Sequence, residues 1–206
     1  MIRDVMLTDV PLTLLARATE EREPFSSFRH AMVLLERGRA DEARATLRTF
    51  LARDGLASRD RLQAWSVLRE LGEAPDGTLV APLGLVIEVG LAEGLDLLGV
   101  YDDFRTSYVN HSGRRVDWDR PDGSLDALVQ PILDAARALP PQLGMPWKGP
   151  KRAPPTRGLV RLNVLTPAGL YFGEGPHEEM ARHPLGGPLL LMATRLMVSL
   201  TERLRH

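Results

Sequence analysis

Cysteine is absent from the 206 residues of the chain. This absence excludes disulfide bonds, thiolate-bound zinc, cysteine-bound iron–sulfur clusters and a cysteine nucleophile. Aromatic residues are also scarce, at 5% of the chain, and lysine occurs only 2 times against 24 arginines. Such an excess of arginine is typical of a GC-rich bacterial genome and does not indicate arginine-specific recognition.

Long hydrophobic runs are missing as well. The nearest is Pro188–Leu200, which Thr194 and Arg195 interrupt and which falls short of the roughly 18–20 apolar residues that a membrane span needs. The first residues of the chain, with Arg3 and Asp4 among short apolar pieces, do not follow the pattern of a secretory signal peptide. We therefore expect a cytoplasmic protein that does not associate with membranes.

The common catalytic motifs are absent too. The sequence contains no GxSxG elbow, no phosphate-binding P-loop and no GxGxxG fingerprint. The segment His177–His183 places two histidines at i and i+6, about 240° apart on a helix, whereas a zinc protease needs them at i and i+4. The sequence thus predicts no catalytic residue, no cofactor and no metal site.

The charge of the chain is balanced as a whole but uneven along its length. The net charge of −1 gives no reason to expect binding to nucleic acid. Residues 76–139 contain 5 basic and 11 acidic residues, whereas residues 140–157 contain 4 basic residues, no acidic residue and 6 prolines. The segment 140–157 is therefore either an extended polar loop, or a basic loop that folds over an acidic surface or is offered to a partner.

Residues 24–71 show the periodicity of three consecutive helices. The first apolar stripe comprises Phe25, Phe28, Met32 and Leu35, and the second Ala43, Leu47, Phe50 and Leu51. The third comprises Leu62, Trp65, either Leu68 or Arg69, and Leu71. Glycines at 38, 55 and 72 follow the three stripes, where a helix commonly ends. We expect residues 1–75 to form a helical segment and no strand within 24–71.

Part of this helical segment resembles the inner half of a tetratricopeptide repeat. The matching residues are Ala31, Leu34, Leu35, Gly38, Glu42, Ala43 and Leu47. Residues 65–68 resemble the start of a second repeat. The resemblance covers residues 24–71 only. A stable array normally needs at least three repeats, and we therefore favour a helical hairpin over a true repeat array.

The rest of the chain, residues 76–206, predicts an α+β domain. A turn signal at 74–77 separates it from the helices, and we expect the sheet to begin after Ala81. Alternating apolar residues predict four short strands between 85 and 118 and two more at 159–165 and 170–172, with helices at 122–139 and from 189 onward. The order ββββαββα favours one antiparallel sheet covered by helices. Pro131 falls inside the first of these helices, where it is tolerated in a first turn or as a kink.

An unusual polar cluster lies at the tip of the expected hairpin between the third and fourth strands. It comprises Asn110, His111 and Ser112. With Gly113 these residues suit a tight turn, in which Asn and Gly supply positive φ and Ser bonds the backbone. The functional alternative is that His111 contacts a ligand or partner, with Trp118 on the neighbouring strand.

Two further candidate residues belong to the proline-rich loop and to the strand after it. Trp147 is expected either to pin the loop at 140–157 to the sheet or to anchor a partner in an interface. Glu174 ends a strand and could hold an arginine of that loop. If a pocket exists between sheet and loop, Asn110 and His111 would converge there with Trp147 and Glu174.

These observations favour a non-enzymatic cytoplasmic adapter that recognises another protein. The alternative is a small-molecule sensor or an enzyme with a pocket near the 110–113 hairpin tip. The C-terminal helix carries apolar residues beyond its core stripe, namely Leu190, Leu191, Met192 and Val198. Such a belt is either buried in the protein or covered in a homodimer.

Overall fold

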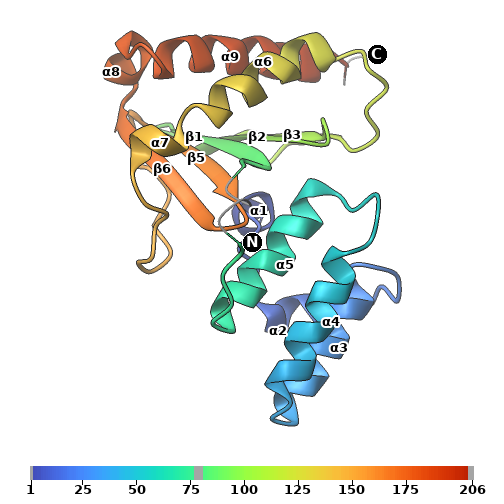
Figure 1. Ribbon diagram of the computed structural model, residues 1–206. Helices are drawn as coiled ribbons and strands as arrows, with labels where there is room; N and C mark the ends of the chain where they lie inside the picture. The colour runs from blue at the N-terminus through green and yellow to red at the C-terminus, as the bar shows by residue number, and fades with distance from the viewer. Residues whose placement is uncertain (1, 77–80, 204–206) are drawn as a thin grey trace. The chain divides into compact units, whose positions relative to one another are not determined.

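The computed structural model describes residues 2–76 and 81–203 and divides the chain into two compact units, Met1–Val80 and Ala81–His206. The first unit contains helices and the second contains an antiparallel sheet with helices, so the predicted α+β class is confirmed (Figure 1). The turn signal at 74–77 ends in Gly77, which lies outside the described residues.

The described part of the first unit is helical. Its elements are α1 (Ile2–Met6), α2 (Leu12–Leu15), α3 (Phe25–Glu36), α4 (Ala40–Leu51) and α5 (Ser58–Glu70). The three helices predicted within 24–71 are therefore confirmed. Between α3 and α4, Ala31 and Ala43 are fully buried, and their small side chains allow the two helices to approach closely. Gly38 joins these helices with a φ of +72°, a conformation that glycine adopts without strain.

The second unit is built on a six-stranded antiparallel sheet. Its strands are β1 (Gly84–Gly90), β2 (Leu95–Tyr101), β3 (Thr106–Val109), β4 (Arg115–Trp118), β5 (Leu159–Thr166) and β6 (Gly169–Pro176). They lie side by side in the order β4-β3-β2-β1-β5-β6. The last strand is longer than the predicted 170–172, because it pairs along all of β5 up to Leu159 and Pro176. The alternation of apolar residues stops at Gly173, which is why the sequence pattern missed the second half of β6.

Helices α6 (Asp126–Arg137) and α9 (Gly186–Glu202) lie side by side over one face of the sheet (Figure 1). Inward residues of the strands, among them Leu85 and Ile87, pack there against Ile132 and Leu189. Each such side chain contributes about 1.5–3 kcal/mol by leaving water. Pro131 lies inside α6 beyond its first turn. Both Pro131 and Ala127, whose carbonyl loses its helical hydrogen bond, are exposed, so water can replace the missing donor.

The proline-rich segment after α6 crosses to the other face of the sheet. Its first residues form a short helix, α7 (Pro140–Leu143), so the prediction of an irregular segment over all of 140–157 is wrong at this end. Two prolines open this helix, where their fixed φ is favourable and no N–H is needed. We call residues 144–157 the strap, and within them the structure has no helix or strand.

The strap approaches the backbone of β1 at Gly90. A Cβ atom added to Gly90 would lie 2.1 Å from the carbonyl oxygen of Thr156 and 2.7 Å from that of Pro155. Gly158, directly after the strap, also donates its N–H to the Gly90 carbonyl at 2.9 Å. Only glycine therefore allows the strap to lie this close to the sheet.

We expect Gly90→Ala to lower the free energy of unfolding by about 1–3 kcal/mol, since the methyl group must displace backbone atoms of the strap. Gly175→Ala is the matched control, because its Cβ would meet only the Met180 side chain at 3.5 Å. Urea denaturation of both variants checks this. Equal stabilities of the two variants would show that the strap is not packed on Gly90.

Candidate functional site

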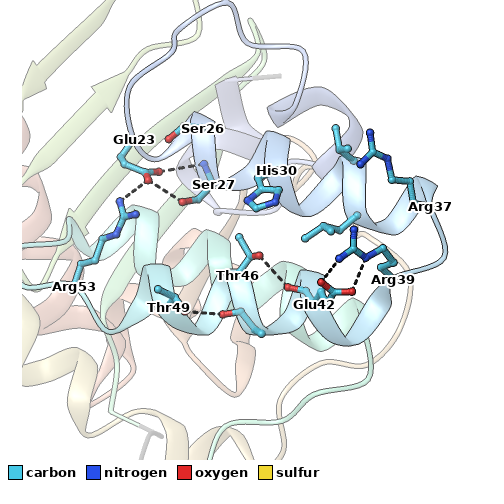
Figure 2. A pocket seen from close by; sticks show the side chains of 13 residues that line it. Glu23, Ser26, Ser27, His30, Arg37, Arg39, Glu42, Thr46, Thr49 and Arg53 are labelled. Atoms are coloured by element: carbon cyan, nitrogen blue, oxygen red, sulfur yellow. Dashed lines mark hydrogen bonds and ion pairs between the residues drawn. The ribbon is translucent and has the colours of Figure 1, made fainter.

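A cleft of about 610 Å³ lies between α3 and α4 in the first unit (Figure 2). Most of the residues that line it are polar or charged, and they come from both helices and from the residues that flank them. The lining residues are Glu23, Ser26, Ser27, His30, Val33, Leu34, Arg37, Arg39, Glu42, Ala45, Thr46, Thr49 and Arg53. Among the apolar lining residues, Leu34 also belongs to the buried core of the helix pair.

Ion pairs mark the two ends of the cleft (Figure 2). At one end Arg53 pairs with Glu23, which also accepts the Ser27 hydroxyl at 2.9 Å. At the other end Arg39 binds Glu42 with two guanidinium nitrogens. The ends of the cleft are thus closed by pairs that already satisfy each other.

The same contacts shift the pKa of both glutamates. Burial raises the pKa of Glu23, but hydrogen bonds from Ser27, Ser26 and Arg53 outweigh it and hold the pKa below its ordinary value. Hydrogen bonding by Arg39 lowers the pKa of Glu42 despite some desolvation. Both carboxylates therefore stay charged at neutral pH.

The hydroxyl groups in the cleft are used by the protein itself. Thr46 donates to the carbonyl of Glu42 at 2.9 Å, and Thr49 donates to that of Ala45 at 3.0 Å. Two lining groups are left over: within residues 2–76 and 81–203, His30 and Arg37 make no hydrogen bond with their side chains. The cleft can therefore offer a guanidinium and an imidazole to an incoming acceptor such as a carboxylate or a backbone carbonyl.

Sequence reasoning identified the helix pair but missed the residues of the cleft. A signal existed, because Ser26, His30, Val33 and Arg37 recur at i, i+4, i+7 and i+11, which is the spacing of one helical face. This second stripe runs along α3 beside the apolar one. Exposed polar stripes are common on helices. This one lines a cleft only because residues of α4 form the opposite wall.

The predicted cluster at the hairpin tip forms a turn, but the positive φ lies at Gly113 (+82°) and not at Asn110 as expected. Asn110 accepts with one side-chain oxygen from the Ser112 hydroxyl at 2.8 Å, the Ser112 N–H at 3.1 Å and the Arg114 N–H at 2.9 Å. The hydroxyl of Ser112 thus donates to Asn110 and not to a base. This is the geometry of turn chemistry and not of an activated nucleophile.

His111 is held by Asp96, a residue that the sequence analysis did not single out. One carboxylate oxygen of Asp96 accepts the His111 N–H at 2.7 Å and lies 3.2 Å from its Nδ1, and the other accepts the Tyr108 hydroxyl at 2.7 Å. Burial, with a smaller contribution from Asp96, raises the pKa of Tyr108. The sequence did contain an indication of this role, because Asp96 is a charged residue on the same face of β2 as the core residue Leu98.

The two candidate tryptophans lie on different parts of the sheet. Trp118 is half-buried at the end of β4, where it packs on the core and the guanidinium of Arg203 lies 4.8 Å from its ring centroid. Trp147 holds the strap against β6, as predicted. Its backbone N–H donates to the Leu170 carbonyl at 2.7 Å, and its ring meets that of Phe172 edge-on, with the ring centroids 5.6 Å apart.

Glu174 does hold an arginine of the strap, as the sequence analysis expected. Arg152 lies 3.3 Å from one oxygen of Glu174, and its guanidinium stacks 4.4 Å from the Phe172 ring centroid. The other oxygen of Glu174 accepts from Nε of Arg161 at 2.6 Å. This second partner, on β5, was not foreseen.

Arg161 is the centre of a buried charged row that crosses three neighbouring strands. The strand register places Glu88, Arg161 and Glu174 directly opposite one another. Arg161 reaches Glu88 at 3.2 Å and donates to the strap carbonyl of Ala153 at 2.8 Å, while Asn163 donates to Glu88 at 3.0 Å. The side chains of Glu88 and Arg161 are 0% and 4% exposed. The row therefore connects the strap to β1, β5 and β6 through side chains of the sheet.

The predicted site residues do not form one pocket. The hairpin tip follows β3, whereas Trp147 and Glu174 lie at β6, and the strands β2, β1 and β5 stand between them. The convergence expected for Asn110 and His111 with Trp147 and Glu174 does not occur.

The two histidines near β6 have local structural contacts. His177 opens α8 (His177–Arg182) and donates its N–H to the Gly158 carbonyl at 2.9 Å. Nδ1 of His183 accepts the N–H groups of Leu185 and Gly186 at 3.2 and 3.3 Å, at the start of α9. Across the described ranges, no three His, Cys, Asp or Glu residues are grouped so that they could hold a metal ion.

Comparison with known proteins gives no relative to draw on. No protein-family model matches the chain, and no curated protein and no solved structure is significantly similar to it. In the described part of the chain, every helix is too short or too polar to span a membrane.

Removing the centre of the charged row should destabilise the second unit strongly. We expect Arg161→Met to lower the free energy of unfolding by about 3–5 kcal/mol, because it leaves the Glu88 carboxylate buried without its cation. The exposed Arg157→Met is the control, with a change below about 0.5 kcal/mol. Urea denaturation is the measurement, and a loss below about 1 kcal/mol for Arg161→Met would contradict the role of the row.

Proposed function

We propose that the chain is a non-enzymatic cytoplasmic adapter, and that the cleft between α3 and α4 binds a segment of another protein. The observation that carries the proposal is the cleft itself, about 610 Å³ in volume, with His30 and Arg37 left for an incoming group. The resemblance of this helix pair to a tetratricopeptide hairpin supports the same function.

The dimensions of the cleft suit an extended peptide. It follows helices of 12 residues each, about 18 Å long at 1.5 Å per residue. A strand-like segment of about five residues has this length. Its backbone carbonyls or a carboxylate could accept hydrogen bonds from Arg37, whose planar guanidinium suits such acceptors.

The polar groups of the cleft favour binding over catalysis. A hydroxyl nucleophile needs an effective base within hydrogen-bonding distance. The hydroxyls of Thr46 and Thr49 donate to backbone carbonyls. The hydroxyl of Ser27 donates to Glu23, whose lowered pKa and pairing with Arg53 make it a poor base. The alternative function, a sensor or enzyme at the hairpin tip, has one observation in its favour, the orientation of His111 by Asp96. The Ser112 hydroxyl beside it is already bonded to Asn110.

Filling the cleft should abolish peptide binding without unfolding the protein. The double variant Ala45→Gln/Thr49→Gln adds volume at two exposed positions of α4 with good helix formers. Peptides selected by the full-length protein from an unbiased display library should bind this variant at least about tenfold more weakly in fluorescence anisotropy.

The matched control is Ala127→Gln/Thr194→Gln, which makes the same changes at exposed helical positions of the second unit. Thr194 donates to the carbonyl four residues before it, as Thr49 does. The control should keep the affinity of the wild type. If no peptide is enriched, or if the selected peptides bind both double variants equally, the cleft is not the binding site.

A second copy of the chain is the partner that we propose for α9. Leu191 and Val198 lie two turns apart on this helix and are 55% and 43% exposed. The neighbouring apolar residues Leu190, Met192 and Met197 are half-buried. Together they extend the apolar belt beyond the four residues that α9 buries in the core, and an exposed belt of this kind is commonly covered by another subunit.

Changing both exposed residues should separate the copies. We expect Leu191→Ser/Val198→Ser to convert a dimer into a monomer while the unfolding temperature changes little, because both side chains are exposed. Analytical ultracentrifugation over a range of concentrations measures this. A wild type that remains monomeric at the highest concentration would refute the dimer.

A further inference from the structure

The strap carries an unusual concentration of positive charge. It contains both lysines of the chain, Lys148 and Lys151, together with Arg152 and Arg157, and it contains no acidic residue. Arg152 is bound to Glu174. Lys148 and Arg157 are exposed and, in the part of the chain that the structure describes, have no acidic partner. The outer surface of the strap is therefore positively charged.

An exposed tryptophan lies in the same segment and is fixed in place. The indole N–H of Trp147 donates to the Pro150 carbonyl at 3.0 Å, and the guanidinium of Arg152 lies 5.6 Å from its ring centroid. Gly149 packs so closely that an added Cβ would lie 2.3 Å from the ring. Despite these contacts Trp147 is 41% exposed, and the nearby Met145 is 75% exposed.

The strap is held in one conformation before any partner binds. The backbone N–H of Trp147 donates to the Leu170 carbonyl of β6 at 2.7 Å, and Arg161 donates to the carbonyl of Ala153 at 2.8 Å. The prolines restrict the backbone further. A partner would consequently meet an ordered surface and lose little affinity to the ordering of this loop.

We propose that the outer surface of the strap is a docking site for an acidic segment of another protein that also carries apolar side chains. Carboxylates of the partner would pair with the exposed cations of the strap, Lys148 and Arg157. An apolar side chain of the partner would pack on Trp147 and Met145. Tryptophan and arginine are the residues that most often dominate binding at interfaces. This site belongs to the second unit and is independent of the cleft between α3 and α4.

The charge of the molecule favours an acidic protein segment over nucleic acid. Residues 81–206 contain 14 basic and 14 acidic residues, and without the strap they contain 10 basic and 14 acidic residues. A polyanion that extended beyond the strap would therefore meet a surface of net negative charge. Proteins that bind nucleic acid usually present an extended basic surface. A short acidic peptide needs contact only with the strap.

The test uses short fluorescent peptides in which glutamate alternates with leucine or phenylalanine, and the full-length protein. A set with lysine in place of glutamate and a single-stranded oligothymidylate are the competing probes. We expect the acidic peptides to bind, with an affinity that falls as salt rises. Carbodiimide coupling should attach their carboxylates to Lys148 or Lys151, as peptide mapping by mass spectrometry can show.

Variants then locate the site. Lys148→Glu/Lys151→Glu and, as a milder change, Lys148→Glu alone should weaken the acidic peptides, the double variant by about tenfold or more. Trp147→Ala should weaken them at high salt as well. The control Arg120→Glu/Arg195→Glu reverses two exposed charges outside the strap and should change the affinity by less than about twofold.

Three results would overturn the proposal: no binding of acidic peptides, equal binding to the strap and control variants, or tighter binding of the oligonucleotide or the basic set. The cleft variant Ala45→Gln/Thr49→Gln should bind the acidic peptides like the wild type. If it loses them instead, the acidic segment docks in the cleft and the strap is not the site. A failure of the strap thus remains distinct from a failure of the cleft.

Discussion

The contact between Arg161 and its two glutamates is the interaction on which the second unit depends most. Arg161 is almost fully buried, and its neighbours in the strand register are Glu88 and Glu174. A guanidinium in this position is tolerated only because carboxylates and a carbonyl surround it. The partners come from two strands and from the strap, so the charge can be satisfied only when all three are in place. The buried cation therefore specifies where the strap lies.

This constraint gives the sheet two different faces. One face is covered by α6 and α9 through ordinary apolar packing. On the other face, β1, β5 and β6 carry glycine and polar residues beside apolar ones such as Val86 and Phe172. The strap lies against this face through hydrogen bonds, an ion pair and the contacts of Arg152 and Trp147 with the Phe172 ring. The strap also binds β6, an edge strand, because the backbone N–H of Trp147 donates to the Leu170 carbonyl, which is then not available for pairing with another chain. A segment without regular structure thus becomes a fixed part of the surface.

Much of the fold could be predicted from the sequence because it follows from periodicity. The three helices of 24–71 and the order of strands and helices after Gly84 depend on apolar repeats that one chain displays locally. The fixing of the loop by Trp147 followed from a lone aromatic residue among prolines. The helix α7 was missed because two leading prolines resemble a loop and also suit a helix start. The helix α8 was missed because its six residues include none that is buried and so show no apolar stripe.

The candidate sites were harder to predict because they depend on neighbours distant in sequence. Glu174 could be expected to meet an arginine, but Glu88 and Arg161 are 73 residues apart, and only the register of β1 and β5 brings them together. Asp96 likewise comes from β2, whereas His111 lies in the turn between β3 and β4. In the first unit, the polar stripe of α3 forms a cleft only together with α4, and the stripe alone does not predict that cleft.

The most direct test of the account is hydrogen–deuterium exchange of the strap in the free, full-length protein. If the charged row fixes the strap, the N–H groups of Trp147 and Gly158, which donate to Leu170 and Gly90, should exchange nearly as slowly as those of β5. In Arg161→Met they should exchange much faster, while the amides of α4 remain unchanged. Exchange of Trp147 and Gly158 in the wild type at the rate of an unprotected loop would contradict the account.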